Sequence, residues 1–264
     1  MNHSSLYDKN IMILGAAGLL GSTLVKGCLN AGANVIAIDC NYSELDRKMK
    51  TIIDRNHHNK VHLFEWDVTG GDFIFELLDS DIIIDGAVNS IYPRNKNYGR
   101  HFFDVEYADF SENLSKNLGG SFVFLQQCAK YFEKRKEDFL SRDKFFSLVN
   151  ISSIYGVINP DFYLYKDTGM TMPVEYSAIK SALIHVSNYV NAYIANSHFR
   201  VNCVSPGGLL DGQPEIFVQR YNKKSYGKGM LEPKDISGAV NFLLSDASKY
   251  ILGQNIVIDD GFSL

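Results

Sequence analysis

The chain has 264 residues, of which 45% are hydrophobic and 21% charged, and its formal net charge is -4 at pH 7. This size and composition indicate a globular chain with a large core and exclude a disordered or collagen-like one. A pI of about 6.0 argues against a nucleic-acid partner, which would need a basic face, and no apolar run approaches the roughly 20 residues that span a bilayer.

Short apolar stretches alternate with longer amphipathic ones along the chain. The apolar stretches predict strands at 10–14, 34–38, 61–66, 81–84, 145–151, 200–204 and 255–258. The amphipathic stretches predict helices at about 20–31, 43–55, 73–78, 109–135, 174–196 and 233–244. Buried strands separated by helices are typical of a parallel sheet covered on both faces. We therefore predict one α/β domain over residues 1–264, a Rossmann-type doubly wound parallel sheet.

Two segments between these elements, Asn89–Asp104 and Tyr155–Pro173, are too long to be simple connections. Loops of this length in a compact domain are often functional. Both follow predicted strands, and open α/β sheets bind ligands at the carboxyl ends of their strands. We therefore expect both segments to border a ligand site.

A glycine-rich turn joins the first predicted strand to the first predicted helix. Its glycines, Gly15, Gly18 and Gly21, would let backbone N–H groups approach a pyrophosphate at a helix N-terminus. The alternative is a turn that uses glycine only for packing. The expected cofactor contacts of this turn are Gly15, Ala17, Gly18, Leu19, Leu20 and Gly21.

Asp39 ends the second predicted strand, where a carboxylate can accept hydrogen bonds from the adenosine ribose of a dinucleotide. The same charge repels a 2′-phosphate, and the three following residues include no arginine that would bind one. The sequence therefore predicts NAD(H) over NADP(H), while a helix-capping carboxylate is the alternative. Asp67 and Val68, after the third strand, are expected beside the adenine.

Tyr176 and Lys180 lie four residues apart, on one face of a predicted helix. A free phenol is a poor base near neutral pH, but a nearby cation stabilises its phenolate. Tyr176 could then exchange a proton with an alcohol or carbonyl oxygen, and Lys180 could also bind the nicotinamide ribose. Taken alone, the spacing is common by chance and is more typical of an amphipathic helix face; the glycine turn and a serine at a separate strand end make chance unlikely.

A serine pair, Ser152 and Ser153, follows the fifth predicted strand. A hydroxyl there could hold the reacting oxygen while Tyr176 handles its proton. We favour Ser153 for this role, and Ser152 is the neighbouring candidate.

With these motifs the chain resembles a compact, single-domain short-chain dehydrogenase/reductase over almost its whole length. By this resemblance Ser153, Tyr176 and Lys180 are the catalytic residues, and Asn117 matches the asparagine that holds a water in the family's proton relay. Pro206 and Gly207 resemble the segment that packs beside the nicotinamide. The resemblance implies hydride transfer between a nicotinamide cofactor and a carbonyl or secondary alcohol.

Two departures from the family pattern concern the cofactor site. The glycine spacing GxxGxxG is more typical of the family's extended branch, although the length argues against that branch. The usual Asn-Asn-Ala-Gly after the fourth strand is replaced by Asp85-Gly-Ala-Val88, so the role of those asparagines is not assigned. Within that stretch, Ala87 is an expected cofactor contact.

Both long segments carry polar and aromatic side chains suited to an oxygen-rich, sugar-like or phosphorylated substrate. From them we expect Arg94, Tyr163 and Tyr165, together with Ser153, to bind substrate; solvated surface loops are the alternative. The same segments resemble dehydrogenases of flagellin modification and nonulosonic-acid pathways.

The leading hypothesis is thus an NAD(H)-dependent oxidoreductase acting on a small polar, sugar-like alcohol or carbonyl. A sugar or sugar-nucleotide epimerase or dehydratase with retained NAD is one alternative. A dinucleotide-sensing protein without catalysis is another, although it would not need the serine, tyrosine and lysine together.

The remaining expectations concern metals, location and assembly. We expect no metal site, because the neighbouring histidines His57, His58 and His62 lack supporting carboxylates. Four scattered cysteines and no visible secretory signal predict a cytoplasmic protein with reduced thiols. The apolar content of the helices at 109–135 and 174–196 allows a homo-oligomer, a dimer or a tetramer.

Overall fold

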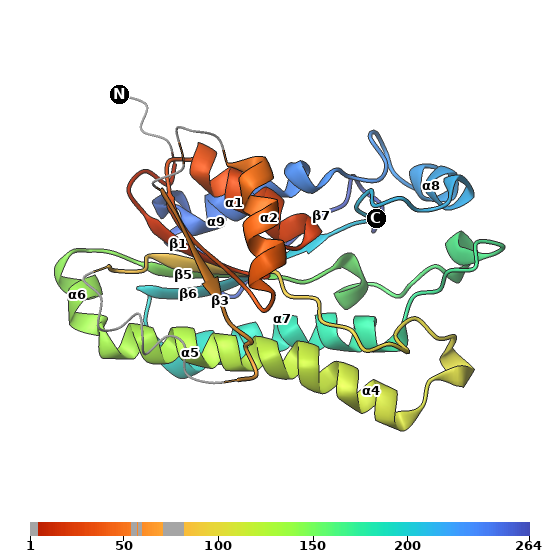
Figure 1. The fold of residues 1–264 in the computed structure, drawn as a ribbon, viewed down its shortest axis with the longest axis horizontal. Helices are drawn as coiled ribbons and strands as arrows, with labels where there is room; N and C mark the ends of the chain where they lie inside the picture. Colours follow the sequence, from red (N-terminus) through yellow and green to blue (C-terminus); the bar gives the residue numbers. More distant parts are fainter. Residues whose placement is uncertain (1–4, 54–56, 58–59, 71–81) are drawn as a thin grey trace.

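Seven parallel strands form one sheet in the order β3-β2-β1-β4-β5-β6-β7 (Figure 1). The structure is a computed structural model that describes residues 5–53, 57, 60–70 and 82–264. The strands are β1 (Asn10–Leu14), β2 (Asn34–Asp39), β3 (Val61–Glu65), β4 (Gly86–Asn89), β5 (Phe146–Ile151), β6 (Phe199–Pro206) and β7 (Asn255–Ile258). The predicted doubly wound sheet in a single domain is confirmed. The strand order reverses between β1 and β4, and such a switch point opens a crevice at the carboxyl ends of the strands.

Helices cover both faces of this sheet (Figure 1). One face carries α1 (Leu19–Asn30), α2 (Tyr42–Ile52) and α9 (Ser237–Leu244), and the other carries α4 (Tyr107–Leu114), α5 (Gly120–Lys134) and α7 (Val174–Ile194). Two shorter helices, α6 (Lys136–Ser141) and α8 (Glu215–Asn222), were not expected from the sequence. In the described part of the chain, no helix is both long and apolar enough to cross a membrane.

The alternation of side chains along each strand divides the core into two layers. In β1, Ile11 and Ile13 pack with the layer under α1 and α9, whereas Met12 and Leu14 pack with the layer under α5 and α7. All four side chains are at most 2% exposed, so β1 is buried on both faces. This explains why the strands read as continuous apolar stretches in the sequence.

A third apolar cluster lies outside the sheet and holds the long segment after β5. Leu164 and Tyr165 of that segment pack with Phe217 and Tyr221 of α8 and with Phe262 near the C-terminus. The rings of Tyr221 and Phe262 are stacked, with centroids 4.1 Å apart. The segment is therefore anchored over the carboxyl ends of the strands by α8 and the last residues of the chain.

The predicted strand at 81–84 is wrong in its position, because the fourth strand comprises Gly86–Asn89. Just before it, side-chain and backbone hydrogen bonds both hold the chain. The Ile84 N–H donates to the Tyr131 hydroxyl at 2.8 Å. Asp85 keeps backbone hydrogen bonds with Asn10 and Ser147, and its carboxylate also accepts from the Asn10 N–H at 2.9 Å. The segment after the strand consequently begins at Ser90, which changes the residues that face the crevice.

The helix predicted at 109–135 is interrupted. The chain forms α4, then a π-helical turn at Ser115–Gly119, then α5. Such turns add a residue to the helix and often occur at functional sites. The helix predicted at 73–78 lies outside the described residues.

Candidate active site

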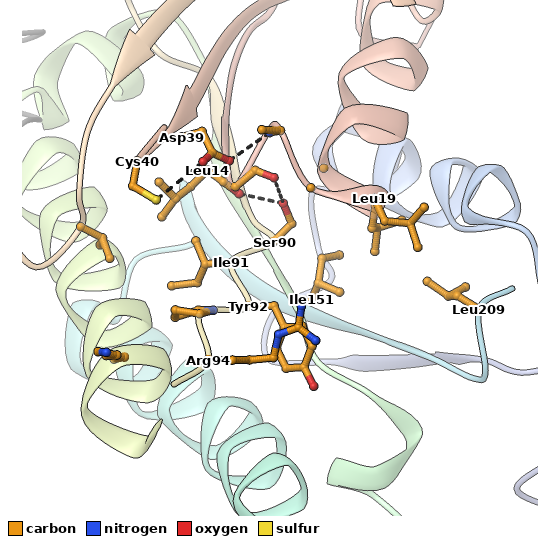
Figure 2. A pocket seen from close by; sticks show the side chains of 18 of the residues that line it. Leu14, Leu19, Asp39, Cys40, Ser90, Ile91, Tyr92, Arg94, Ile151 and Leu209 are labelled. Atoms are coloured by element: carbon orange, nitrogen blue, oxygen red, sulfur yellow. Dashed lines mark hydrogen bonds between the residues drawn. The ribbon is translucent and has the colours of Figure 1, made fainter. Parts of the chain in front are cut away.

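A cavity of about 880 Å³ opens at the carboxyl ends of the strands (Figure 2). The glycine turn, the end of β2, the turn after β4 and the first turns of α7 border it. Many of the sequence-predicted site residues line it: Gly15, Ala17, Gly18, Leu19, Leu20, Gly21, Asp39, Asp67, Val68, Arg94, Tyr176, Lys180, Pro206 and Gly207. The fold thus brings together residues that are far apart in the sequence.

The glycine turn has the geometry of an anion cradle. Gly15 has a φ of +80°, and a Cβ built on Gly21 would lie only 2.0 Å from the Gly15 carbonyl oxygen, so a side chain at Gly21 does not fit. Gly18 is the N-cap of α1 and supplies no side-chain cap, which leaves N–H groups of the first turn available to a ligand. A dinucleotide pyrophosphate fits these features.

Ser90 supports the turn from below, and the sequence analysis did not identify it. Its hydroxyl donates to the Leu14 carbonyl at 2.7 Å, and a Cβ on Gly15 would come within 3.0 Å of the Ser90 backbone (Figure 2). Ala87, an expected cofactor contact, is instead fully buried in β4 within the core. The misplaced fourth strand is the reason that Ser90 was missed.

Asp39 holds the glycine turn and also faces the cavity. One carboxylate oxygen of Asp39, labelled in Figure 2, accepts from the Ala17 N–H at 3.0 Å. The other accepts from the Asn41 N–H at 3.3 Å. The capping role considered as the alternative for Asp39 belongs to Asn41, whose side chain accepts from the Glu44 N–H. The remaining lone pairs of Asp39 could accept hydrogen bonds from ribose hydroxyls.

Asp67 and Val68 form the neighbouring wall of the cavity. The backbone N–H and hydroxyl of Thr69 donate to the Asp67 carboxylate at 2.9 and 2.7 Å. These two hydrogen bonds lower the pKa of Asp67. The carboxylate is therefore ionised and fixed at the place expected for the adenine.

Tyr176 and Lys180 meet in the cavity, as their spacing on α7 predicts. The Lys180 ammonium lies 5.6 Å from the centroid of the Tyr176 ring and donates to the Ile151 carbonyl at 2.9 Å. Burial lowers the pKa of Lys180 from 10.5 to about 8. Burial also raises the pKa of Tyr176, although a hydrogen bond with Ser153 opposes this rise. Without a ligand, the phenol is thus a proton donor near neutral pH.

The two serines after β5 have different partners. The Ser152 hydroxyl donates to the Lys180 carbonyl at 2.9 Å and so holds α7 against the sheet. Ser153 is 5% exposed, accepts from the Tyr155 N–H at 3.2 Å and bonds with Tyr176. Ser152 lines the cavity, whereas Ser153 is the serine whose hydroxyl bonds with Tyr176.

Asn117 lies in the π-helical turn between α4 and α5 and is 1% exposed. Among the residues that the structure describes, no donor reaches its side-chain carbonyl oxygen. A buried polar oxygen of this kind usually binds a water. This environment fits the water-holding asparagine that the resemblance implies.

The expected substrate residues separate in the structure. Arg94 lines the cavity, whereas Tyr163 is 64% exposed with its ring under the Arg220 guanidinium. Tyr165 is buried and its hydroxyl bonds to that of Tyr155 at 3.3 Å. Neither tyrosine lines the cavity, because α8 takes up this part of the segment.

Tyr92 is a cavity residue that sequence reasoning left unassigned. Its ring meets the Tyr176 ring edge to face, with centroids 5.4 Å apart. The sequence marked it only as one tyrosine of a long loop.

For metals, no group of three or more potential ligands occurs within residues 5–53, 57, 60–70 and 82–264.

Comparisons with known proteins agree with this geometry. A family model described as Enoyl-(Acyl carrier protein) reductase matches residues 15–263. Post-translational flagellin modification protein A of Campylobacter coli is 34% identical, covering 98% of this chain and 100% of that protein. The 3-oxoacyl-[acyl-carrier-protein] reductase FabG of Thermotoga maritima is 27% identical, with 97% and 98% covered.

Among solved structures, a short-chain dehydrogenase from Leptospira borgpetersenii with bound NAD+ is similar to this chain. It is 31% identical, with a TM-score of 0.82, and 100% of this chain and 96% of that one are covered. The fold, the glycine turn and the Ser–Tyr–Lys arrangement define a dinucleotide-dependent oxidoreductase that acts on CH–OH groups. The chain belongs to the short-chain dehydrogenase/reductase family.

Proposed function

We propose that the protein is an NAD(H)-dependent oxidoreductase that interconverts a secondary alcohol and a carbonyl on a small polar, sugar-like substrate. The observation that carries this proposal is the meeting of Tyr176 and Lys180 in the cavity that the glycine turn borders, with Ser153 hydrogen-bonded to Tyr176. A dinucleotide-sensing protein has no need for a phenol, an ammonium and a hydroxyl gathered at one point.

The preference for NAD(H) rests on Asp39. Its carboxylate faces the cavity at the end of β2, where it would accept from ribose hydroxyls and repel a 2′-phosphate. The Leptospira relative, which is 31% identical, was solved with NAD+. We therefore expect NADPH to bind much more weakly than NADH.

The cofactor, when bound, supplies the hydride chemistry. The chain's own residues position the substrate and move its proton. Ser153 holds the reacting oxygen, and Tyr176 gives a proton to it in reduction or accepts one in oxidation. Lys180 stabilises the phenolate that forms when Tyr176 gives up its proton. Asn117 holds a water through which Tyr176 regains a proton.

The substrate class follows from the groups around the mouth of the cavity. Arg94 and Lys116 line it and provide cations, while Tyr92 adds an aromatic ring to the same wall. Such groups favour an oxygen-rich molecule over an acyl chain or a steroid. The 34% identical Campylobacter relative is named for flagellin modification, which agrees with the resemblance noted from the sequence.

We also propose that the protein is a homo-oligomer, a dimer or a tetramer, that contacts copies of itself through α5 and α7. These helices expose Phe122, Tyr189 and Tyr193, which are 48%, 65% and 77% accessible in the single chain. Large exposed aromatic side chains on neighbouring helices are typical of subunit interfaces.

A screen of keto-sugars, sugar alcohols and sugar phosphates with NADH, NAD+ and the corresponding NADP cofactors tests the function. We expect a change in the absorbance of the reduced nicotinamide with at least one such substrate, and a large preference for NAD(H). The Ser153→Ala variant should lose most of this turnover, whereas Ser263→Ala, which does not line the cavity, should retain it. Turnover of a sugar without any net change in the cofactor would contradict the proposal and indicate an epimerase or dehydratase.

A further inference from the structure

The ring of Tyr92 borders both catalytic side chains of α7. Its centroid lies 5.4 Å from that of Tyr176 at an interplanar angle of 73°, and 5.9 Å from the Lys180 ammonium. Tyr92 belongs to the turn after β4, so it approaches α7 from a different element (Figure 2). The ammonium therefore has an aromatic ring on two sides, one from its own helix and one from the opposite wall.

The orientation of Tyr92 is fixed by its neighbours. Its hydroxyl donates to that of Tyr98 at 2.9 Å, and the two rings meet edge to face at 5.7 Å. The Arg94 guanidinium lies 4.9 Å from the centroid of the Tyr92 ring. The ring is thus held both at its hydroxyl and at its face.

The loop that carries Tyr92 is tied to α4. The side chains of Asn95, Asn97 and Arg100 all donate to the carboxylate of Asp109, at distances of 2.9 to 3.1 Å. Asp109 is 7% exposed, so these bonds are largely protected from water. The loop that carries Tyr92 is therefore a fixed wall of the cavity.

A nearby aromatic ring is important for the Lys180 ammonium, because this cation is buried without an acidic partner. It is 4% exposed and donates to the Ile151 carbonyl, and in the described part of the chain no carboxylate forms an ion pair with it. The other titratable groups that face it are the Tyr176 phenol on its own helix and the Cys203 thiol of β6. The negative face of an aromatic ring can offset part of the desolvation of a buried cation.

We propose that Tyr92 is a positioning residue whose ring keeps Lys180 charged and holds Tyr176 in place within the cavity. The role of these two groups in proton transfer is the proposed function on which this inference rests. The hydroxyl of Tyr92 serves only to orient the ring through Tyr98. A substitution that keeps the ring and one that removes it should consequently differ.

Direct titration of Lys180 tests the proposal without a substrate. The lysine side chains are labelled with carbon-13 at the ε position, and Lys180 is assigned from the signal that Lys180→Met removes. The NMR pKa of Lys180 is then compared in the wild type, Tyr92→Phe and Tyr92→Leu. We expect Tyr92→Leu to lower this pKa by about half a unit or more, since a cation–π contact is worth about 0.5–1 kcal/mol or more, and Tyr92→Phe to leave it within a few tenths.

Equal pKa values in wild type and Tyr92→Leu would overturn the proposal, and so would equal shifts in Tyr92→Phe and Tyr92→Leu. Circular dichroism establishes that each variant is folded, and Tyr92→Met serves as the second variant without a ring if Tyr92→Leu does not fold. Lys224, whose ammonium lies 5.0 Å from the Phe262 ring, provides an internal control that should not respond.

The outcome is distinguishable from a failure of the proposed function. If Tyr176→Phe retained full turnover, the proton-transfer mechanism would be wrong, whatever the titration of Lys180 showed. If Tyr176→Phe were inactive while Tyr92→Leu left the pKa of Lys180 unchanged, only the role of Tyr92 would be wrong.

Discussion

Burial shifts the pKa values of Tyr176 and Lys180, the two α7 groups proposed to be catalytic, in opposite directions. It lowers the pKa of the Lys180 ammonium to about 8 and raises the pKa of the Tyr176 phenol. In both groups the neutral form is favoured, because a low-dielectric cavity penalises charge. A charged Lys180 beside Tyr176 therefore lowers the free energy of unfolding.

This cost predicts a pH-dependent effect of Lys180→Met on stability. Between about pH 8 and 10.5 the unfolded chain binds more protons at Lys180 than the folded chain, so wild-type stability rises with pH over this range. The penalty is complete below pH 8. We expect Lys180→Met to unfold at a higher temperature than wild type at pH 7, and this advantage to shrink by pH 10. Thermal melts at both values measure it, with the exposed Lys223→Met as control.

The Asp39 carboxylate leads to a separate prediction about the preference for NAD(H) over NADP(H). Replacing its carboxylate by Ala removes the charge that repels a 2′-phosphate, so Asp39→Ala should raise the NADP(H)/NAD(H) ratio of kcat/KM by on the order of ten- to a hundredfold. Asp46→Asn, which changes an exposed carboxylate of α2, should leave this ratio unchanged. An unaltered ratio in Asp39→Ala would remove the basis for the NAD(H) preference.

The glycine turn shows how an element is determined by close backbone approach. Gly21 lies in the first turn of α1, and this turn passes so close to the Gly15 carbonyl that there is no room for a Cβ on Gly21. The space that remains lies on the cavity side, where a phosphate can reach the N–H groups. The turn is thus shaped by packing and serves binding at the same time.

Gly21→Ala should therefore weaken dinucleotide binding strongly and destabilise the fold by ~1–3 kcal/mol, the range for overpacking. Gly238→Ala is the matched control, since the space around Gly238 in α9 is open and alanine favours helix by ~0.5–1 kcal/mol. NADH fluorescence titration and chemical denaturation measure the two effects. A Gly21→Ala variant that binds NADH like wild type would contradict the turn's assignment.

The sequence predicted most elements of the sheet because its inner strands are buried on both faces and therefore form apolar stretches in the sequence. It failed at the fourth strand, where the Ile84 N–H donates to the distant Tyr131 hydroxyl and the Asp85 carboxylate accepts from the Asn10 backbone N–H. The strand was placed five residues too early, so the sequence did not indicate which side chains of the following segment, Ser90 and Tyr92 among them, face the cavity. Local patterns do not contain such long-range contacts.

The sequence could not determine where the Tyr163 side chain lies, because that position also depends on long-range contacts. The segment after β5 does form a wall near the cavity, but Arg220 of α8, 57 residues away, donates to the Tyr163 carbonyl and lies over its ring. The meeting of Tyr176 and Lys180 was easier to predict, because a spacing of four residues along one helix places two side chains on the same face.

At the scale of the whole molecule, the reversal of strand order places the cavity where the two halves of the chain meet. The glycine turn, Asp39 and Asp67 come from the first half, between β1 and β4, and Tyr176 and Lys180 from the second half, after β5. The third apolar cluster then joins the segment after β5 to α8 and to the end of the chain. Residues of both halves are therefore needed to complete the cavity.

The exposed aromatic side chains of α5 and α7 predict assembly at this scale. Light scattering should give a particle mass of two or four times the chain mass of 29.7 kDa. The double variant Phe122→Lys and Tyr193→Lys should shift the mass toward one chain, whereas Tyr226→Lys and Tyr250→Lys, exposed on other elements, should not. A wild-type protein that is a monomer at micromolar concentration would contradict the proposed assembly.

Turnover by Tyr176→Phe, measured together with NADH affinity on the same sample, tests the account most directly. Removing one hydroxyl should reduce kcat by at least a hundredfold, the usual range for a lost general acid or base, with little change in NADH affinity. Tyr189→Phe, on the exposed face of the same helix, should behave like wild type. Wild-type turnover by Tyr176→Phe would show that the phenol at the centre of this cavity does not transfer the proton.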